Sequence, residues 1–457
     1  MEVGNKIMHV ADGVFYDMND FKTKRNNNVM VFGASGTSKT RSIVIPNILQ
    51  ATGSYVVSDP KGALYKDYKD YLIRKGYYVY NINLKETHKS NYFNPFAYIK
   101  DEQDILKVAS ILVGKEDAGQ TNSKFFTNAG KYLLASIIAF VKYEMCVVKH
   151  NFGCVAEILS TGCVENMDVT PTVREYLKTL TNKDGKPIWT DEELYNIDMV
   201  PIDIKKYLKF RQAQSPSVAS KLFSICTSGN AKETVDCIFM EALNAVNIFN
   251  FHGINLLTSR SEFDFEMLAT HRTAIFISCS DTDRSLDPLC NLIYTQILQV
   301  LCDYADNKCK EHRLKIDVRF ILDDFATNYK IVDFDKSIAM IRSRGISATI
   351  IVQDYNQLEY AYGIAGKTIC NNCDTWVFLG ANDYNTASIM AKQVNTTTEK
   401  LMDMKIGECY IYRRAEKTKH TKVINLDKFK KIIRRKNGII KNYRAIIESP
   451  QKVGFHA

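Results

Sequence analysis

The sequence predicts an α/β protein with a mainly parallel central sheet and an inserted all-α domain. Short apolar runs that end at polar residues or glycine alternate with helical segments, as in parallel strands joined by right-handed crossovers. The runs stop near residue 100 and resume near residue 262, and the stretch between them has apolar residues at helical spacing. At 457 residues the chain also exceeds the usual size of one compact core. We therefore expect two domains.

The first part of the sheet domain is expected in residues 1–100. The apolar run Asn28 to Phe32 ends at a Gly/Ser/Thr-rich turn, after which Lys39 to Gln50 can form a helix. Ser54 to Ser58 and Tyr77 to Ile82 are further apolar runs, separated by a helical stretch. This order of strand, loop and helix favours a parallel sheet.

Residues 101–261 are expected to form the all-α insertion. Ile105, Val108 and Leu112 recur at helical spacing, long helical patterns follow, and no strand-like alternation is convincing. Residues 262–425 would complete the sheet domain. Their strand signals lie at Thr273 to Ser278, Val318 to Leu322, Ala348 to Val352 and Thr375 to Leu379.

Residues 426–457 are expected to form a basic C-terminal tail. The formal net charge is +9, and much of the excess lies between Arg413 and Arg444. Such a run is either an ordinary solvated face or a surface for a polyanion, because clustered cations gain free energy by releasing counterions. The sequence does not separate DNA from anionic lipid as that polyanion.

Composition excludes several classes of protein. Hydrophobic residues make up 46% and charged residues 24%, which is ordinary for a globular chain. The start has no apolar signal region, and the longest apolar run, Tyr132 to Val141, is shorter than the ~20 residues of a membrane-spanning helix. The 12 cysteines have no regular spacing and predict buried, reduced thiols; Cys370 and Cys373 form one CxxC without a second pair for zinc. We expect a cytoplasmic chain without a transmembrane segment.

A phosphate-binding loop is predicted where the first strand ends. The sequence GASGTSKT is close to GxxxxGK[ST] and sits between a strand and a helix. Lys39 would reach the β/γ oxygens of ATP, and Thr40 would hold Mg²⁺. Ser38 stands where the motif has glycine, and a strained non-glycine residue costs roughly 1 to 3 kcal/mol. The predicted nucleotide-binding residues are Gly33, Ala34, Ser35, Gly36, Thr37, Ser38, Lys39 and Thr40.

A second strand supplies the carboxylates that hydrolysis requires. In VRFILDD, Val318 to Asp324, Asp323 would contact Mg²⁺ through water and Asp324 would orient or activate the attacking water. Alone, an Asp pair after a strand can also cap the next helix. Together with the phosphate loop, the pair predicts an ATPase.

These motifs and others in the same order resemble the TraG-like coupling proteins of type IV secretion and conjugation. The resemblance runs from Asn28 to Thr398 and includes SDPKG at Ser58 to Gly62, FILDDFA at Phe320 to Ala326, the stretch Arg342 to Gly363, and Asn372 to Ala387. It implies a RecA-like P-loop ATPase with an all-α insertion. It also implies a homo-hexamer, or a monomer in the absence of DNA, that couples ATP hydrolysis to the transfer of single-stranded DNA and its processing complex into a secretion channel at the inner membrane.

The resemblance assigns two further catalytic residues. Gln353 is similar to a polar sensor of the γ-phosphate, and Arg342 resembles an arginine that reaches the nucleotide of a neighbouring subunit. From the residues alone, a buried side-chain hydrogen bond for Gln353 and a solvated charge for Arg342 are alternatives.

The chain departs from the family pattern in three places, and two alternative functions stay open. Ser38 replaces a glycine, Asp324 stands where relatives commonly have Glu, and no membrane anchor precedes Gly33. The anchor is then removed, encoded separately, or replaced by partners that recruit the chain to the cytoplasmic face of the membrane. The alternatives are a nucleotide-binding docking protein with little turnover and an FtsK/HerA-like double-stranded DNA pump.

Overall fold

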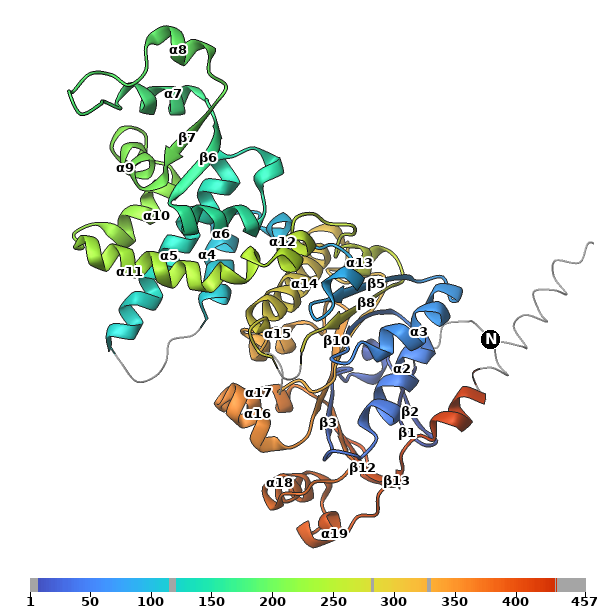
Figure 1. The fold of residues 1–457 in the computed structure, drawn as a ribbon. Coiled ribbons are helices and arrows are strands. Elements are labelled where there is room, and N and C mark those ends of the chain that lie inside the picture. The colour runs from blue at the N-terminus through green and yellow to red at the C-terminus, as the bar shows by residue number, and fades with distance from the viewer. Residues whose placement is uncertain (1–6, 115–120, 281–282, 327–329, 432, 434–457) are drawn as a thin grey trace, which may run out of the picture. The chain divides into compact units, whose positions relative to one another are not determined.

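The computed structural model describes residues 7–114, 121–280, 283–326, 330–431 and 433 (Figure 1). The chain divides into two compact units, and the second interrupts the first in sequence. The first unit comprises Met1–Asn81, Phe265–Asp281 and Leu301–Ala457, and the second comprises Ile82–Asp264 and Thr282–Val300. The domain limits given above remain predictions, and most of the expected basic tail lies outside the described residues.

A large sheet forms the centre of the first unit. Among the described residues it has nine strands in the order β13-β12-β11-β3-β10-β9-β4-β8-β5. The strands from β11 to β8 run parallel, whereas β12 and β13 are antiparallel. The strand bounds are β3 Val29–Phe32, β4 Ser54–Ser58, β5 Tyr78–Asn83, β8 Thr273–Ser278, β9 Val318–Leu322, β10 Ile346–Val352, β11 Thr375–Phe378, β12 Glu408–Arg413 and β13 Lys419–Lys422. The predicted mainly parallel sheet is confirmed.

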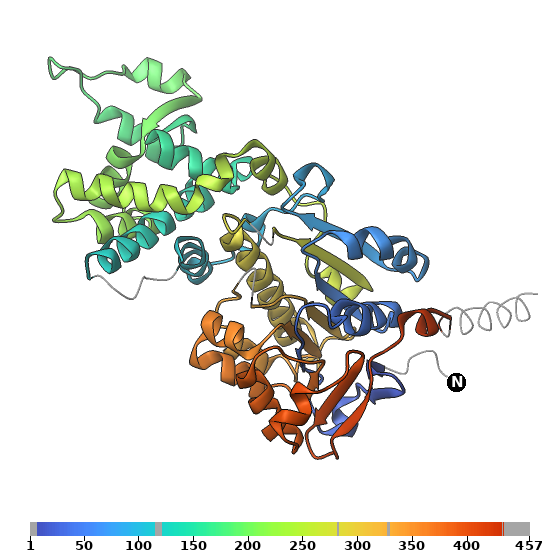
Figure 2. The same ribbon diagram turned by 60° about the horizontal axis from the view of Figure 1, so that its bottom comes forward.

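Both faces of the parallel strands are buried, which explains why these strands read as continuous apolar runs. Val31, Ile321 and Ile351 belong to the core cluster on one face, together with apolar side chains of α2 (Ile45–Gln50) and α3 (Ala63–Arg74). Figures 1 and 2 show α2 and α3 on one side of the sheet and α16 and α17 on the other. The remaining helices whose residues lie wholly in this unit are α1 Asp20–Thr23, α13 Met267–Thr270, α15 Phe334–Met340, α16 Tyr355–Tyr362, α17 Ile364–Asn371, α18 Tyr384–Val394 and α19 Thr398–Met402.

The second unit is mainly helical. Its long helix α5 carries Leu133, Ile137 and Phe140, all fully buried, and packs against α4, α10 and α11. The helices are α4 Glu102–Val113, α5 Thr121–Glu144, α6 Phe152–Thr161, α7 Pro171–Lys178, α8 Asp191–Asn196, α9 Ile204–Gln214, α10 Val218–Thr227, α11 Lys232–Val246, α12 His252–Thr258 and the first part of α14 Asp287–Lys308.

Six strands in the described ranges were not predicted, and they pair in antiparallel fashion as β1 (Ile7–Ala11) with β2 (Val14–Asp17), β12 with β13, and β6 (Cys163–Asp168) with β7 (Met199–Asp203). The hairpin of β1 and β2 and the edge strands β12 and β13 belong to the first unit. The third pair, β6 with β7, lies in the helical unit, where no strand was expected. A register shift separates Val164 from Met167, the two buried residues of β6, so the apolar alternation typical of a strand is broken.

The expectation of buried, reduced cysteines is partly wrong. Cys279 and Cys290 are disulfide-bonded, and the free thiols of Cys146, Cys163 and Cys237 are exposed. Cys370 and Cys373 are buried, and burial raises the pKa of Cys370 to about 12. The backbone carbonyls of these two residues accept hydrogen bonds from Trp376 Nε1 of β11. The CxxC segment therefore forms part of the turn that precedes β11.

None of the helices in the described ranges combines the length and the apolar character that a membrane-spanning helix requires.

Candidate nucleotide site

The predicted phosphate loop begins at the carboxyl end of β3, in the middle of the sheet. Phe32, the last residue of β3, is in register with Val352 of β10 and Phe378 of β11. The Gly33 N–H donates to Val352 O at 3.2 Å, and the Ala34 N–H donates to the Gly380 carbonyl at 2.9 Å. The start of the loop is therefore fastened to both neighbouring strands.

Ser38 has the left-handed backbone that the motif glycine normally supplies. Its φ is 63°, and Gly36 two residues earlier has a φ of 83°. The Ser38 carbonyl accepts two bonds from Ser42, from the N–H and from Oγ, each at 2.8 Å, which hold the start of the following π-helical turn Thr40–Val44. A serine in this conformation is strained, whereas a glycine is not. The strain foreseen from the sequence is present in the fold.

The side chain of Lys39 lies over the loop itself. Its Nζ donates to Gly33 O at 2.6 Å and to Ala34 O at 3.1 Å. Burial lowers the pKa of Lys39, and the nearby carboxylates of Asp324 and Asp323 oppose that shift. The one cation inside the loop is thus held where phosphate oxygens are expected to bind.

The two predicted metal ligands lie in contact. Thr40 Oγ1 donates to Asp323 Oδ2 at 2.6 Å, joining residues that are 283 positions apart in the chain. Asp323 follows β9, and β10 lies between β9 and β3. Burial raises the pKa of the Asp323 carboxyl to about 6, while the Thr40 hydrogen bond lowers it. Oxygen donors of this kind suit Mg²⁺.

Asp324 and Gln353 lie at the same edge of the sheet. Asp324 has a left-handed φ of 54°, and the next residue, Phe325, donates its N–H to Ile351 O at 3.0 Å. Gln353 directly follows β10, whose last residue is level with Phe32, so it lies between the phosphate loop and the Asp pair. Both side chains are partly exposed. The loop, the Asp pair and the glutamine therefore come together.

The family of the chain follows from comparison with known proteins. A family model described as "Type IV secretory system Conjugative DNA transfer" matches residues 2–425. The chain belongs to this family. It is 23% identical over 380 residues to Protein VirD4 of Rhizobium radiobacter and 22% identical over 391 residues to Conjugal transfer protein TraG of Escherichia coli. Each match covers 81% of this chain, but the chain spans only 48% and 55% of the lengths of these curated relatives.

Solved structures of conjugative coupling proteins share the fold. The unbound monoclinic form of the bacterial conjugative coupling protein TrwBdeltaN70 matches with a TM-score of 0.62 at 13% identity, over 93% of this chain and 90% of that one. TrwB in complex with ADP and Mg²⁺ matches with a TM-score of 0.58 at 15% identity, over the same shares of the two chains. The resemblance to TraG-like coupling proteins and the RecA-like P-loop fold are confirmed.

Arg342 is the one predicted site residue of this coupling-family chain that lies elsewhere. It precedes β10 and therefore lies at the amino end of the sheet, whereas the phosphate loop lies at the carboxyl end. Its Nε is 3.7 Å from Asp20 Oδ2, and its side chain is 42% exposed. Within one chain, Arg342 does not reach the phosphate loop.

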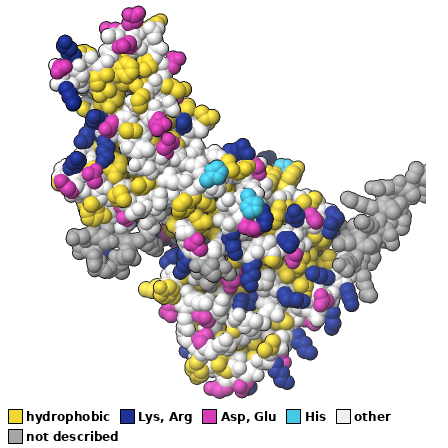
Figure 3. Space-filling model, viewed as in Figure 1, with side chains coloured by type: hydrophobic (Ala, Val, Ile, Leu, Met, Phe, Trp, Pro, Cys, Tyr) yellow, Lys and Arg dark blue, Asp and Glu magenta, His cyan; other side chains and the backbone are white. Residues whose placement is uncertain are grey.

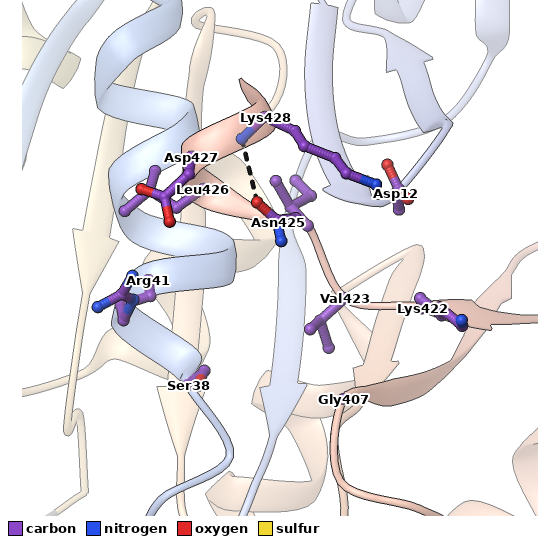
Figure 4. A pocket seen from close by; sticks show the side chains of 11 residues that line it. Asp12, Ser38, Arg41, Gly407, Lys422, Val423, Asn425, Leu426, Asp427 and Lys428 are labelled. Carbon is purple, nitrogen blue, oxygen red and sulfur yellow. Dashed lines mark hydrogen bonds between the residues drawn. The ribbon is translucent and has the colours of Figure 1, made fainter. Parts of the chain in front are cut away.

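A cavity beside the phosphate loop was not predicted from the sequence. Ser38 and Arg41 line one wall, and a segment near the C-terminus, residues 422–428, lines another (Figure 4). Arg41 directly follows the phosphate-loop motif in sequence, so its place beside the loop could have been predicted from that position. The C-terminal segment follows two short antiparallel strands, and no motif marked it.

Proposed function

We propose that this chain is a coupling ATPase that drives the transfer of DNA, or of a DNA–protein complex, through a type IV secretion channel. The observation that carries the proposal is the contact between Thr40 and Asp323 beside the loop of Lys39. A phosphate loop alone binds nucleotide, whereas hydrolysis also needs carboxylates near the metal and the attacking water. Membership of the conjugative DNA-transfer family supports the cargo and the channel.

At the carboxyl edge of the sheet, some residues would bind the nucleotide and others would take part in its hydrolysis. The N–H groups of Gly33 to Thr40 and the amine of Lys39 would bind the phosphates of ATP. Thr40 and Asp323 would hold Mg²⁺, which neutralises charge on the phosphate oxygens when bound. Asp324 would orient the attacking water, and Gln353 would sense the γ-phosphate. TrwB structures with ADP and Mg²⁺ and with a non-hydrolysable ATP analogue support the same ligands here.

A ring of subunits explains the position of Arg342. A partly exposed arginine at the amino edge of one subunit can neutralise charge at the carboxyl edge of the next. This geometry supports a homo-hexamer that assembles on DNA, with a monomer in the absence of DNA. In this proposal Arg342 of each subunit completes the site of its neighbour.

The cargo is proposed to be single-stranded DNA with its processing complex. Figure 3 shows Lys and Arg side chains over the part of the first unit that carries α3, where Lys66 and Arg74 are exposed. Cations on that surface support a polyanionic partner. Channel components at the inner membrane would recruit the chain to the cytoplasmic face of the membrane.

The decisive experiment measures ATP hydrolysis with no DNA, with single-stranded DNA and with double-stranded DNA. We expect single strands to stimulate turnover and Lys39→Ala to reduce it to background, because the substitution removes the loop cation. Lys336→Ala, which removes an exposed lysine that is already paired with Asp333, is the matched control and should retain turnover. Stimulation by double strands alone would favour the FtsK/HerA-like pump, and equal turnover in Lys39→Ala would remove the assigned site.

A docking protein with little turnover is the second candidate. The left-handed φ of Ser38 and the short side chain of Asp324 favour it, because both weaken a hydrolytic site. The double substitution Ser38→Gly with Asp324→Glu tests it. A docking protein gains nothing in DNA transfer from these changes, whereas a large gain in both turnover and transfer supports the motor.

A further inference from the structure

The SDPKG motif, Ser58 to Gly62, begins at a buried hydroxyl that contacts the Asp pair. Ser58 is the last residue of β4 and is 1% exposed. β4 runs parallel to β9, with Val57 in register with Ile321, so Ser58 lies at the carboxyl edge beside the end of β9. Its Oγ donates a hydrogen bond to the Asp323 carbonyl at 3.1 Å. The motif therefore contacts the candidate site through its first residue.

This hydrogen bond holds one of the two peptide groups that flank Asp324. The Asp323 carbonyl belongs to the peptide before Asp324, and the Phe325 N–H belongs to the peptide after it. The Phe325 N–H donates to Ile351 O of β10 at 3.0 Å. The backbone around Asp324 is thus bound to β4 on one side and to β10 on the other.

Asp324 needs this support because its backbone is strained. Its φ of 54° is left-handed, a conformation that a residue other than glycine keeps where the surrounding structure imposes it. The peptide before Asp324 defines this φ, because it contains both the Asp323 carbonyl and the Asp324 nitrogen. A donor on that carbonyl therefore resists the rotation that would relax φ to a negative value.

The place of the Asp324 carboxylate depends on the same backbone. Burial lowers the pKa of Lys39, and the Asp324 carboxylate opposes that shift, so the carboxylate lies close to the phosphate loop. An aspartate has a single methylene between its backbone and its carboxylate. A small rotation of the backbone at Asp324 would therefore displace the carboxylate from the attacking water.

We propose that Ser58 is a positioning residue for hydrolysis, whose hydroxyl fixes the strained backbone that directs Asp324 toward the attacking water. The inference rests on the proposed function, because it names the group that holds the proposed water-orienting carboxylate. In this role Ser58 touches neither the nucleotide nor the metal. It acts on the rate of hydrolysis and not on nucleotide affinity.

The test measures kcat for ATP hydrolysis and the affinity for a non-hydrolysable ATP analogue, both with the full chain. We expect Ser58→Ala to lower kcat about 10- to 100-fold, because a displacement of roughly 1 Å can cost that much. Its affinity for the analogue should equal that of the native chain. Ser58→Thr keeps the hydroxyl on a β-branched residue that suits a strand, and it should restore most of kcat.

Ser54→Ala is the matched control at the other end of β4. Ser54 is fully buried, and its Oγ donates to His271 O at 3.0 Å and accepts the Thr273 N–H at 3.1 Å. Its substitution removes both of these hydrogen bonds, so a general loss of stability would lower kcat at least as much as in Ser58→Ala. We expect native kcat in Ser54→Ala.

A double-mutant cycle with Asp324→Ala, followed by single-turnover hydrolysis, determines whether Ser58 acts through Asp324. In the Asp324→Ala background, Ser58→Ala should lower the rate no further, because residues that act as a unit are not additive. Three results each overturn the inference alone: native kcat in Ser58→Ala, lost analogue binding in Ser58→Ala, or an equal fold-loss in both backgrounds. A native chain that does not hydrolyse ATP even with single-stranded DNA overturns the proposed function, and this inference with it.

Discussion

Charged side chains have different partners at the two ends of the central sheet. At the amino end, arginines are paired with acids: Arg344 Nη2 lies 2.6 Å from Asp306 Oδ2, and Arg313 Nη2 lies 2.9 Å from Asp20 Oδ1. At the carboxyl end, Lys39 is bound by loop carbonyls, and burial raises the pKa of Asp323. One end is neutralised within the chain, and the other keeps groups that suit a ligand.

Left-handed backbone occurs at both ends of the sheet: Lys24, Ala51 and His312 precede strands, whereas Ser38 and Asp324 follow them. Ser38 and Asp324, one in the phosphate loop and one in the Asp pair, both have left-handed φ values at the carboxyl end. Strained residues and shifted pKa values gather where a protein sacrifices stability for binding or catalysis. Since left-handed backbone occurs at both ends, the charge partners mark the carboxyl end as the functional one, and Arg342 remains the exception at the amino end.

The largest effect is expected from Arg342→Ala. If Arg342 acts on the neighbouring subunit, DNA-stimulated hydrolysis should fall about 10³-fold or more, the range seen for arginines acting in trans. Nucleotide affinity of the single subunit should stay unchanged, because Arg342 is remote from its own phosphate loop. Titration calorimetry and steady-state hydrolysis measure the two quantities separately.

Mixing variants sharpens this test. Oligomers that combine Lys39→Ala and Arg342→Ala subunits contain interfaces with both intact residues, so part of the activity should return. Arg344→Ala removes an arginine that is already bound to Asp306 and should reduce hydrolysis far less. Native turnover in Arg342→Ala, or no recovery on mixing, would show that the arginine does not act across an interface.

The parallel core and the phosphate edge were predictable from the sequence for one physical reason. Strands buried on both faces must be continuously apolar, and parallel strands place their carboxyl ends together. Once β3, β9 and β10 were recognised, the residues after each strand had to lie at one edge, and the Thr40 contact with Asp323 agrees with this. The apolar pattern of each strand and the parallel arrangement of the strands therefore predict the same site.

The cavity beside the phosphate loop and the antiparallel strands were not predictable in this way. β13 has no buried residue, and β12 alternates buried with partly buried positions, so neither strand resembles the apolar runs of the core. The position of Asn425 depends on backbone bonds to distant residues such as Gly407, and no local pattern encodes them. The position of this segment is therefore determined by the pairing of short edge strands that are distant in sequence from the phosphate loop.

An effect of intermediate size is expected for Asp323→Asn, on the free energy of unfolding. The pKa of this carboxyl is raised from 3.8 to about 6, so the folded state holds a proton that the unfolded state has already released. The free energy of unfolding should fall as pH rises from about 4 through 6, and stay lower above that range. Asp323→Asn should remove this dependence and stabilise the metal-free protein at pH 7.5 by up to roughly 3 kcal/mol.

Urea denaturation in EDTA without nucleotide measures this difference. Asp70→Asn, on the exposed side of α3, should follow the native pH dependence. The stabilised Asp323→Asn protein should also lose hydrolysis, because it lacks the carboxylate. A native-like or lower stability in Asp323→Asn at pH 7.5 would contradict a desolvated carboxyl at this position.

The smallest effect is expected from Ser38→Gly. Glycine adopts a φ of 63° without strain, so the substitution should raise the free energy of unfolding by about 1 kcal/mol and strengthen nucleotide binding by a few fold. Ser35→Gly is the matched control, because Ser35 lies in the same loop outside the left-handed region and gains only flexibility. If both substitutions destabilise the chain equally, the strain at Ser38 does not limit the loop. If only Ser38→Gly stabilises it, the strain at Ser38 keeps the phosphate loop below its best affinity for nucleotide.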